Sequence, residues 1–179
     1  MQILDITTLK IRYDKPIVLA LGFFECVHLG HRAIIDKVLE LSKKHNAAPA
    51  ITTFTNNPNN KEKKLINNYE ERLEKFKNLG LQIVLASEFN DNFKLVQAEE
   101  FLELLKTKLK IKALVCGTDY KFGFKAEGCT KILQEFCSQN NIELCIIAPV
   151  MRGDTRISST IIRQYLENND LEKVKKLLG

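Results

Sequence analysis

A chain of 179 residues with 45% hydrophobic and 27% charged residues has the length and composition of one ordinary globular domain. The net charge of +5 is compatible with an anionic substrate, but the scattered basic residues do not indicate nucleic-acid binding. The sequence has no apolar run of membrane-spanning length and no signal-peptide core, so we expect a cytoplasmic protein with no membrane partner. Five cysteines without a CxxC pair predict neither a disulfide framework nor a zinc site. The oligomeric state stays open.

Short apolar runs alternate along the chain with segments of helical periodicity. We expect five strands, at residues 17–22, 49–54, 81–86, 113–117 and 142–150. We expect helices at residues 30–45, 69–79, 97–110, 130–140, 160–168 and 170–178. The segment TNNPNNKEKK, residues 55–64, predicts a mobile loop. This order is typical of a single α/β domain over residues 1–179, with a mostly parallel sheet and helices on both faces.

Ligands of open α/β sheets bind beyond the carboxyl ends of the strands. The turns that leave this edge hold most of the unusual residues of the chain. They are residues 22–31, 54–60, 117–128 and 151–159. We therefore expect the functional site where these turns converge.

The turn GFFECVHLGH, residues 22–31, leads from a buried strand into a helix. Free backbone N–H groups at a helix start attract anions, and His28 and His31 are spaced to face the same point there. This pattern predicts a phosphate site, in which the imidazoles donate hydrogen bonds or, if protonated, offset negative charge. Two surface histidines are the simpler alternative, and a metal site finds no third ligand at a suitable spacing.

The segment RISSTIIR, residues 156–163, carries a second candidate site for an anion. Ser158 or Ser159 is a natural N-cap, and capping alone would explain both serines. The functional interpretation adds Arg163, one turn into the helix, and Arg156, in the loop, as bidentate phosphate ligands.

The other two turns carry weaker signals. Asp119, at the end of the fourth expected strand, could accept hydrogen bonds from ribose hydroxyls or simply form the turn. Phe54, at the tip of the second expected strand, could stack on a flat ring or belong to the core.

Together the four segments resemble the N-terminal adenylyltransferase module of the prokaryotic bifunctional riboflavin kinase/FAD synthetases. That family carries G-x-F-D-G-V-H-x-G-H, T-F-x-P-x-P, G-x-D-F-x-F-G and I-S-S-T-x-I-R, where this chain has GFFECVHLGH, TFTNNPNN, GTDYKFGFKAEG and RISSTIIR. The resemblance implies a Rossmann-like domain of the HxGH nucleotidyltransferase type. It also implies transfer of AMP from ATP to FMN, giving FAD and pyrophosphate, with Mg²⁺ bound mainly through the ATP phosphates.

The resemblance implies residue roles as well. His28, His31 and Arg163 would be catalytic, with no residue ligating a metal directly. The further ATP-binding positions would be Gly22, Phe23, Gly30, Asp119, Arg156, Ser158, Ser159 and Thr160. FMN would lie against Phe54, Asn57 and Phe122.

The chain departs from the family pattern at three points, of which Glu25 and Cys26 favour a non-catalytic relative. Glu25-Cys26 replaces Asp-Gly, where a glycine could serve a positive φ or a close approach of the ligand, so Cys26→Gly is expected to keep or raise activity. Asn56 stands where proline is usual, and the chain ends at Gly179, where the riboflavin kinase domain would begin, so we expect no kinase domain. The rivals are an HxGH nucleotidyltransferase with another phosphorylated acceptor and a non-catalytic nucleotide- or flavin-binding relative.

Overall fold

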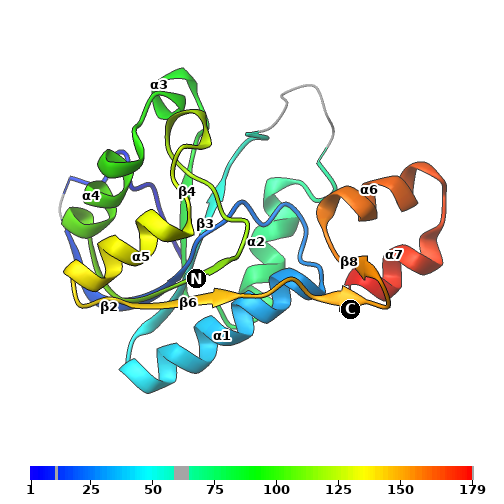
Figure 1. The fold of residues 1–179 in the computed structure, drawn as a ribbon, viewed down its shortest axis with the longest axis horizontal. Coiled ribbons are helices and arrows are strands. Elements are labelled where there is room, and N and C mark those ends of the chain that lie inside the picture. The colour runs from blue at the N-terminus through cyan, green and yellow to red at the C-terminus, as the bar shows by residue number, and fades with distance from the viewer. Residues whose placement is uncertain (11, 59–64, 179) are drawn as a thin grey trace.

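The computed structural model describes residues 1–10, 12–58 and 65–178, and Figure 1 shows their arrangement. The predicted mobility of residues 55–64 concerns a segment whose residues 59–64 lie outside this description. None of the described helices is both long enough and apolar enough to cross a bilayer.

Six of the described strands form a parallel sheet in the order β1-β4-β3-β2-β5-β6. Their bounds are β1 Gln2–Leu4, β2 Tyr13–Ala20, β3 Ala48–Phe54, β4 Ile83–Ser87, β5 Leu109–Gly117 and β6 Glu143–Ile147. The expected count of five strands was wrong, because the three-residue edge strand β1 lies in a mixed segment without a recognisable period. The parallel α/β architecture itself is confirmed. Within β2, Ile17 to Ala20 are fully buried, as expected for a strand covered on both faces.

The long helices follow the predicted order: α1 Leu29–His45, α2 Tyr69–Asn78, α4 Ala98–Lys108, α5 Thr130–Gln139, α6 Ser159–Glu167 and α7 Leu171–Leu178. Asn46 ends α1 in the left-handed conformation, and Asn68 and Glu71 form a capping box at the start of α2. Three short elements were not predicted: α3 Asp91–Lys94, the 3₁₀ turn η1 Phe124–Ala126, and the hairpin of β7 Met151–Arg152 with β8 Thr155–Arg156.

Helices cover both faces of the sheet, as predicted (Figure 1). The α4 and α5 helices pack on one face through Leu102, Leu105 and Leu133. The α1 and α2 helices pack on the other through Ile35, Val38 and Phe76, with Val18 and Val84 of the sheet. A third, smaller cluster joins Cys26 to α6 and α7 through Ile157, Ile162, Val174 and Leu177.

Candidate active site

A pocket of about 240 Å³ opens beyond the carboxyl ends of β2, β5 and β6. The chain runs from β2 outward to β3 and β4, then returns to place β5 on the other side of β2, so this is where the strand order reverses. The pocket draws on three of the four predicted turns, and the predicted residues that line it are Gly22, His28, Gly30, His31, Asp119, Arg156, Ser158 and Ser159. The structure therefore brings together most of the positions that were expected to contact ATP.

The first turn folds around Phe24, which has a φ of 54° and is only 2% exposed. A Cβ atom at Gly22 would lie 2.7 Å from the Phe24 ring, so the turn requires a glycine at that position. Cys26 does not have a positive φ. The expectation that a glycine at position 26 could serve a positive φ was wrong, because Phe24 takes the left-handed conformation instead.

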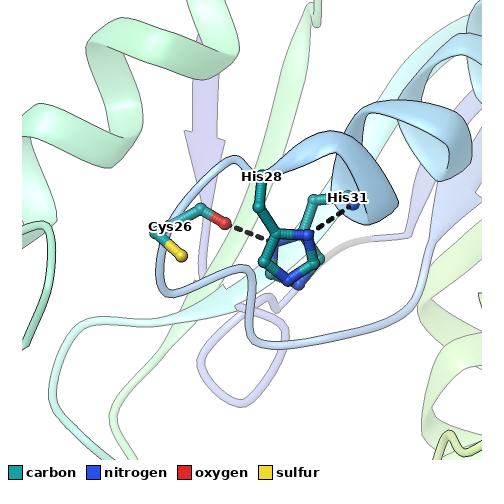
Figure 2. Close-up of side chains that lie close together, drawn as sticks. All are labelled: Cys26, His28 and His31. Carbon is teal, nitrogen blue, oxygen red and sulfur yellow. Dashed lines mark hydrogen bonds between the residues drawn. The ribbon is translucent and has the colours of Figure 1, made fainter. Parts of the chain in front are cut away.

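His28 and His31 lie face to face at the start of α1 (Figure 2), with ring centroids 3.7 Å apart and planes inclined by 13°. His28 is the N-cap residue, and its Nδ1 accepts a hydrogen bond from the backbone N–H of His31, at 3.1 Å. His31 Nδ1 bonds to the carbonyl oxygen of Cys26. A Cβ atom at Gly30 would lie 3.1 Å from the His28 ring, so the glycine allows this close approach.

These hydrogen bonds set the protonation of the two rings. A carbonyl oxygen can only accept, so His31 Nδ1 carries the proton and His31 Nε2 is free of one in the neutral ring. His28 Nδ1 accepts, so its Nε2–H is a donor. Burial lowers the pKa of His28 to about 3, with further lowering by His31, and burial lowers the pKa of His31 to about 4. Both imidazoles are thus neutral at pH 7 in the free protein.

Cys26 supplies the third potential metal ligand that its spacing in the sequence did not suggest. One ligand atom each of Cys26, His28 and His31 lies within 4.8 Å of the others. However, the imidazole planes are nearly parallel, so their in-plane lone pairs do not converge on one point. The available lone pair of His28 is already used in capping α1. The arrangement therefore favours hydrogen bonding to an anion over metal ligation.

The start of α6 forms the opposite wall of the pocket. Ser158 is the N-cap, accepting from Ile161 N–H at 3.4 Å, and Ser159 Oγ lies 3.5 Å from Cys26 Sγ. Cys26 thus links the turn of residues 22–31, which we call the imidazole turn, to the start of α6 at Ser159. Arg156, in β8, forms an ion pair with Asp119 after β5, so a cation and an anion meet at the pocket mouth.

Arg163 and Thr160 do not line this pocket. Arg163 extends from α6 to Glu25 Oε1, at 2.5 Å, and the same oxygen accepts from Ile66 N–H at 3.0 Å. Thr160 is exposed on the first turn of α6. The guanidinium that lines the pocket is that of Arg156, whereas Arg163, which was expected to bind phosphate, lies outside the pocket and bonds to Glu25.

Phe54 and Phe122 lie outside the pocket, in a row of aromatic side chains that continues from Phe122 to Tyr120. Phe54 contacts Phe93 at a centroid distance of 5.3 Å, and Phe101 continues the row to Phe122 at 5.7 Å. Phe23, which was expected to bind ATP, is not among the lining residues either; its ring lies 6.1 Å from that of Phe54, and its neighbours Gly22 and Phe24 line the pocket. Sequence reasoning missed Phe93, because it belongs to the unpredicted α3.

Asn56 explains the second departure from the family pattern. Its side-chain amide donates to Phe89 O at 3.1 Å and accepts from Phe89 N–H at 2.8 Å. This pair holds Phe89 against Phe54, at a centroid distance of 5.1 Å. Asn57 follows, half-buried, outside the pocket.

Comparison with known proteins gives consistent relatives. Residues 10–161 match the family model described as FAD synthetase. The chain is 32% identical over 167 residues to a bifunctional riboflavin kinase/FMN adenylyltransferase of Buchnera aphidicola, covering 89% of this chain and 54% of that protein. It is 30% identical over 168 residues to the protein of that name from Listeria monocytogenes, covering 90% and 53%. The chain therefore spans about half the length of the curated relatives it matches.

Two solved structures share the fold. A Streptococcus pneumoniae structure named as a macrolide-efflux protein superposes with a TM-score of 0.87 at 27% identity, covering 100% of this chain and 70% of that one. The pantothenate synthetase of Thermus thermophilus superposes with a TM-score of 0.56 at 11% identity, covering 99% and 71%. The second likeness concerns the fold alone.

Proposed function

The chain belongs to the FAD synthetase family, and on that premise we propose that it transfers AMP from ATP to FMN, giving FAD and pyrophosphate. A phosphate oxygen of FMN attacks the α-phosphorus of ATP, a new P–O bond forms, and the bond to the leaving pyrophosphate breaks. The observation that best supports this proposal is the pocket in which the stacked imidazoles of His28 and His31 face the start of α6 and Arg156. Alignment and charge stabilisation are what this chemistry needs.

The geometry supports distinct roles for the residues around ATP. His28 Nε2–H donates to a phosphate oxygen. The bound anion raises the pKa of His31, so that His31 Nε2 becomes protonated and can also donate. Ser158 and Ser159 add polar groups at the start of α6, an end that favours anions. Arg156 exchanges Asp119 for a phosphate, which frees the carboxylate for ribose hydroxyls.

Mg²⁺ is part of the proposal as the partner of the ATP phosphates. Among the described pocket-lining residues, Asp119 is the only carboxylate, and it is paired with Arg156. One such oxygen donor does not make a protein-borne Mg²⁺ site, but it fits an ion that keeps its waters and binds through substrate phosphates.

The flavin side of the proposal uses the aromatic row. FMN lies with its ring system towards Phe54 and Asn57, and its phosphate reaches past Phe23 to the imidazoles. Phe122 is only 8% exposed and contacts the ring of Phe101 in that row. A cytoplasmic location belongs to the proposal, because both substrates are cytoplasmic metabolites.

The test is incubation with ATP, Mg²⁺ and FMN, followed by chromatography for FAD. His31→Ala, purified in the same way, controls for contaminating enzymes and should lose turnover far more than FMN binding. Replacing FMN by other phosphorylated acceptors tests the first rival. Binding of both substrates without any FAD would contradict the proposal and favour the non-catalytic rival.

A further inference from the structure

Arg72, on α2, is a fully buried cation with 0% exposure. Its Nη1 donates to Thr53 Oγ1 at 2.5 Å and its Nη2 to Phe54 O at 2.9 Å. Its Nε donates to Asn68 O at 3.3 Å. The guanidinium also lies over the Phe23 ring, 5.0 Å from the centroid. The side chain is well hydrogen-bonded, but every one of these partners is uncharged.

Within the described part of the chain, Arg72 forms no ion pair with a carboxylate. Glu25 is near enough to act on it through space, but the Glu25 carboxylate bonds to Arg163 and Ile66. Burial lowers the pKa of Arg72, which records the desolvation of its charge. A buried charge without a counter-ion is costly, and an anion bound nearby offsets that cost.

The place of Arg72 in the fold indicates which anion that is. Thr53 Oγ1 accepts from Arg72 and donates to Phe23 O at 2.7 Å, which links α2 through β3 to the imidazole turn. Arg72 thus lies next to both Phe23 and Phe54, whose rings are neighbours, and Phe23 belongs to the same turn as the two histidines. A flavin phosphate that runs from Phe54 to the imidazoles passes over this point.

We propose that Arg72 is a specificity-determining residue, whose buried charge makes the site prefer a flavin carrying a phosphate over the same flavin without one. This inference rests on the proposed function, because it requires FMN to be the acceptor. Arg72 is enclosed and acts at a distance, without touching the ligand. Charge interactions of this kind persist in a poorly hydrated interior.

The test compares FMN with riboflavin, which share the flavin ring, by quenching of flavin fluorescence. Arg72→Met removes the charge at similar volume and should reduce the preference for FMN roughly tenfold, with riboflavin binding nearly unchanged. Arg72→Lys keeps the charge and should keep the preference, although lost hydrogen bonds lower both affinities. Lys77→Met removes an exposed charge from the same helix and should leave the preference unchanged.

A merely structural role would shift Phe23 and Phe54 and weaken both flavins equally, so an unchanged preference in Arg72→Met overturns the inference. If Arg72→Met fails to fold, Arg72→Lys decides, and loss of preference in this charged variant also overturns it. Both the inference and the proposed function fail if the wild-type protein binds neither flavin. Only the inference fails if the wild-type protein makes FAD but binds FMN and riboflavin equally.

Discussion

Glu25 should contribute strongly to stability, and Glu25→Ala measures that contribution. Its carboxylate is buried, and Oε1 accepts from Arg163 on α6 and from Ile66 N–H, at the approach to α2. One oxygen therefore holds the imidazole turn, α6 and the entry to α2 together. Alanine removes both bonds at once.

The structure sets the magnitude. A hydrogen bond to a charged group contributes about 1.5–3 kcal/mol, and breaking a buried ion pair costs more when a charge is left unhydrated. The Arg163 side chain is 28% exposed and can regain part of its hydration, which reduces the cost. We expect a loss of about 2–4 kcal/mol in the free energy of unfolding, or a fall in Tm of about 5–12 °C for a chain of this size.

Urea and thermal unfolding, followed by circular dichroism, check this value. Glu143→Ala is the matched control, because Glu143 also bonds two side chains, those of Lys44 and His45, but its own side chain is 36% exposed. The control should lose less than about 1 kcal/mol. Equal losses in Glu25→Ala and Glu143→Ala would refute the claim that burial makes the Glu25 contacts strong.

Three further predictions follow from the same geometry. His28 and His31 have pKa values lowered to about 3 and 4, so the unfolded chain binds their protons first as pH falls below about 6.5. The free energy of unfolding should therefore fall between pH 6.5 and 4, by at most about 1.4 kcal/mol per pH unit for each histidine. Urea unfolding at a series of pH values measures this dependence, and an equally steep dependence in His28→Gln would contradict the prediction. Cys26 is fully buried and has no positive φ, so Cys26→Gly should lower the free energy of unfolding by about 1–3 kcal/mol, measured by calorimetry. The same variant should not form FAD faster than the wild-type protein, measured by chromatography. Asn56→Ala loses both bonds to Phe89 and should weaken FMN binding several-fold in a fluorescence titration while the KM for ATP stays constant.

The order of the main elements could be predicted because each carries its own local signal. Apolar runs mark the central strands, and Asn46 and Gly80 mark helix ends. The edge strand β1 and helix α3 were missed because elements of three or four residues are too short to show a period. Their existence depends on neighbours distant in sequence, such as the pairing of Gln2 with Ile83.

The convergence of the turns at the sheet edge was also predictable, because topology alone places them there. The spacing of residues in the sequence could not predict the hydrogen-bond or ion-pair partner of each side chain. Arg163 and Arg156 carry similar signals in the sequence, but Arg163 pairs with Glu25 whereas Arg156 lines the pocket. The capping role of His28 and the burial of Arg72 likewise depend on contacts that have no periodicity.

The small cluster of Cys26, Ile157, Ile162, Val174 and Leu177 has a consequence for local opening of the protein. It anchors α6 and α7 through only a few buried residues, whereas the sheet rests on two larger clusters, and α6 and α7 stand to one side of the sheet (Figure 1). Segments with few buried contacts open most readily. Because Ser158 and Ser159 lie at the start of α6, a bound nucleotide should stabilise the packing of α6 and α7 against the rest of the protein. Deuterium uptake should then slow in both helices, including α7, which the nucleotide does not touch.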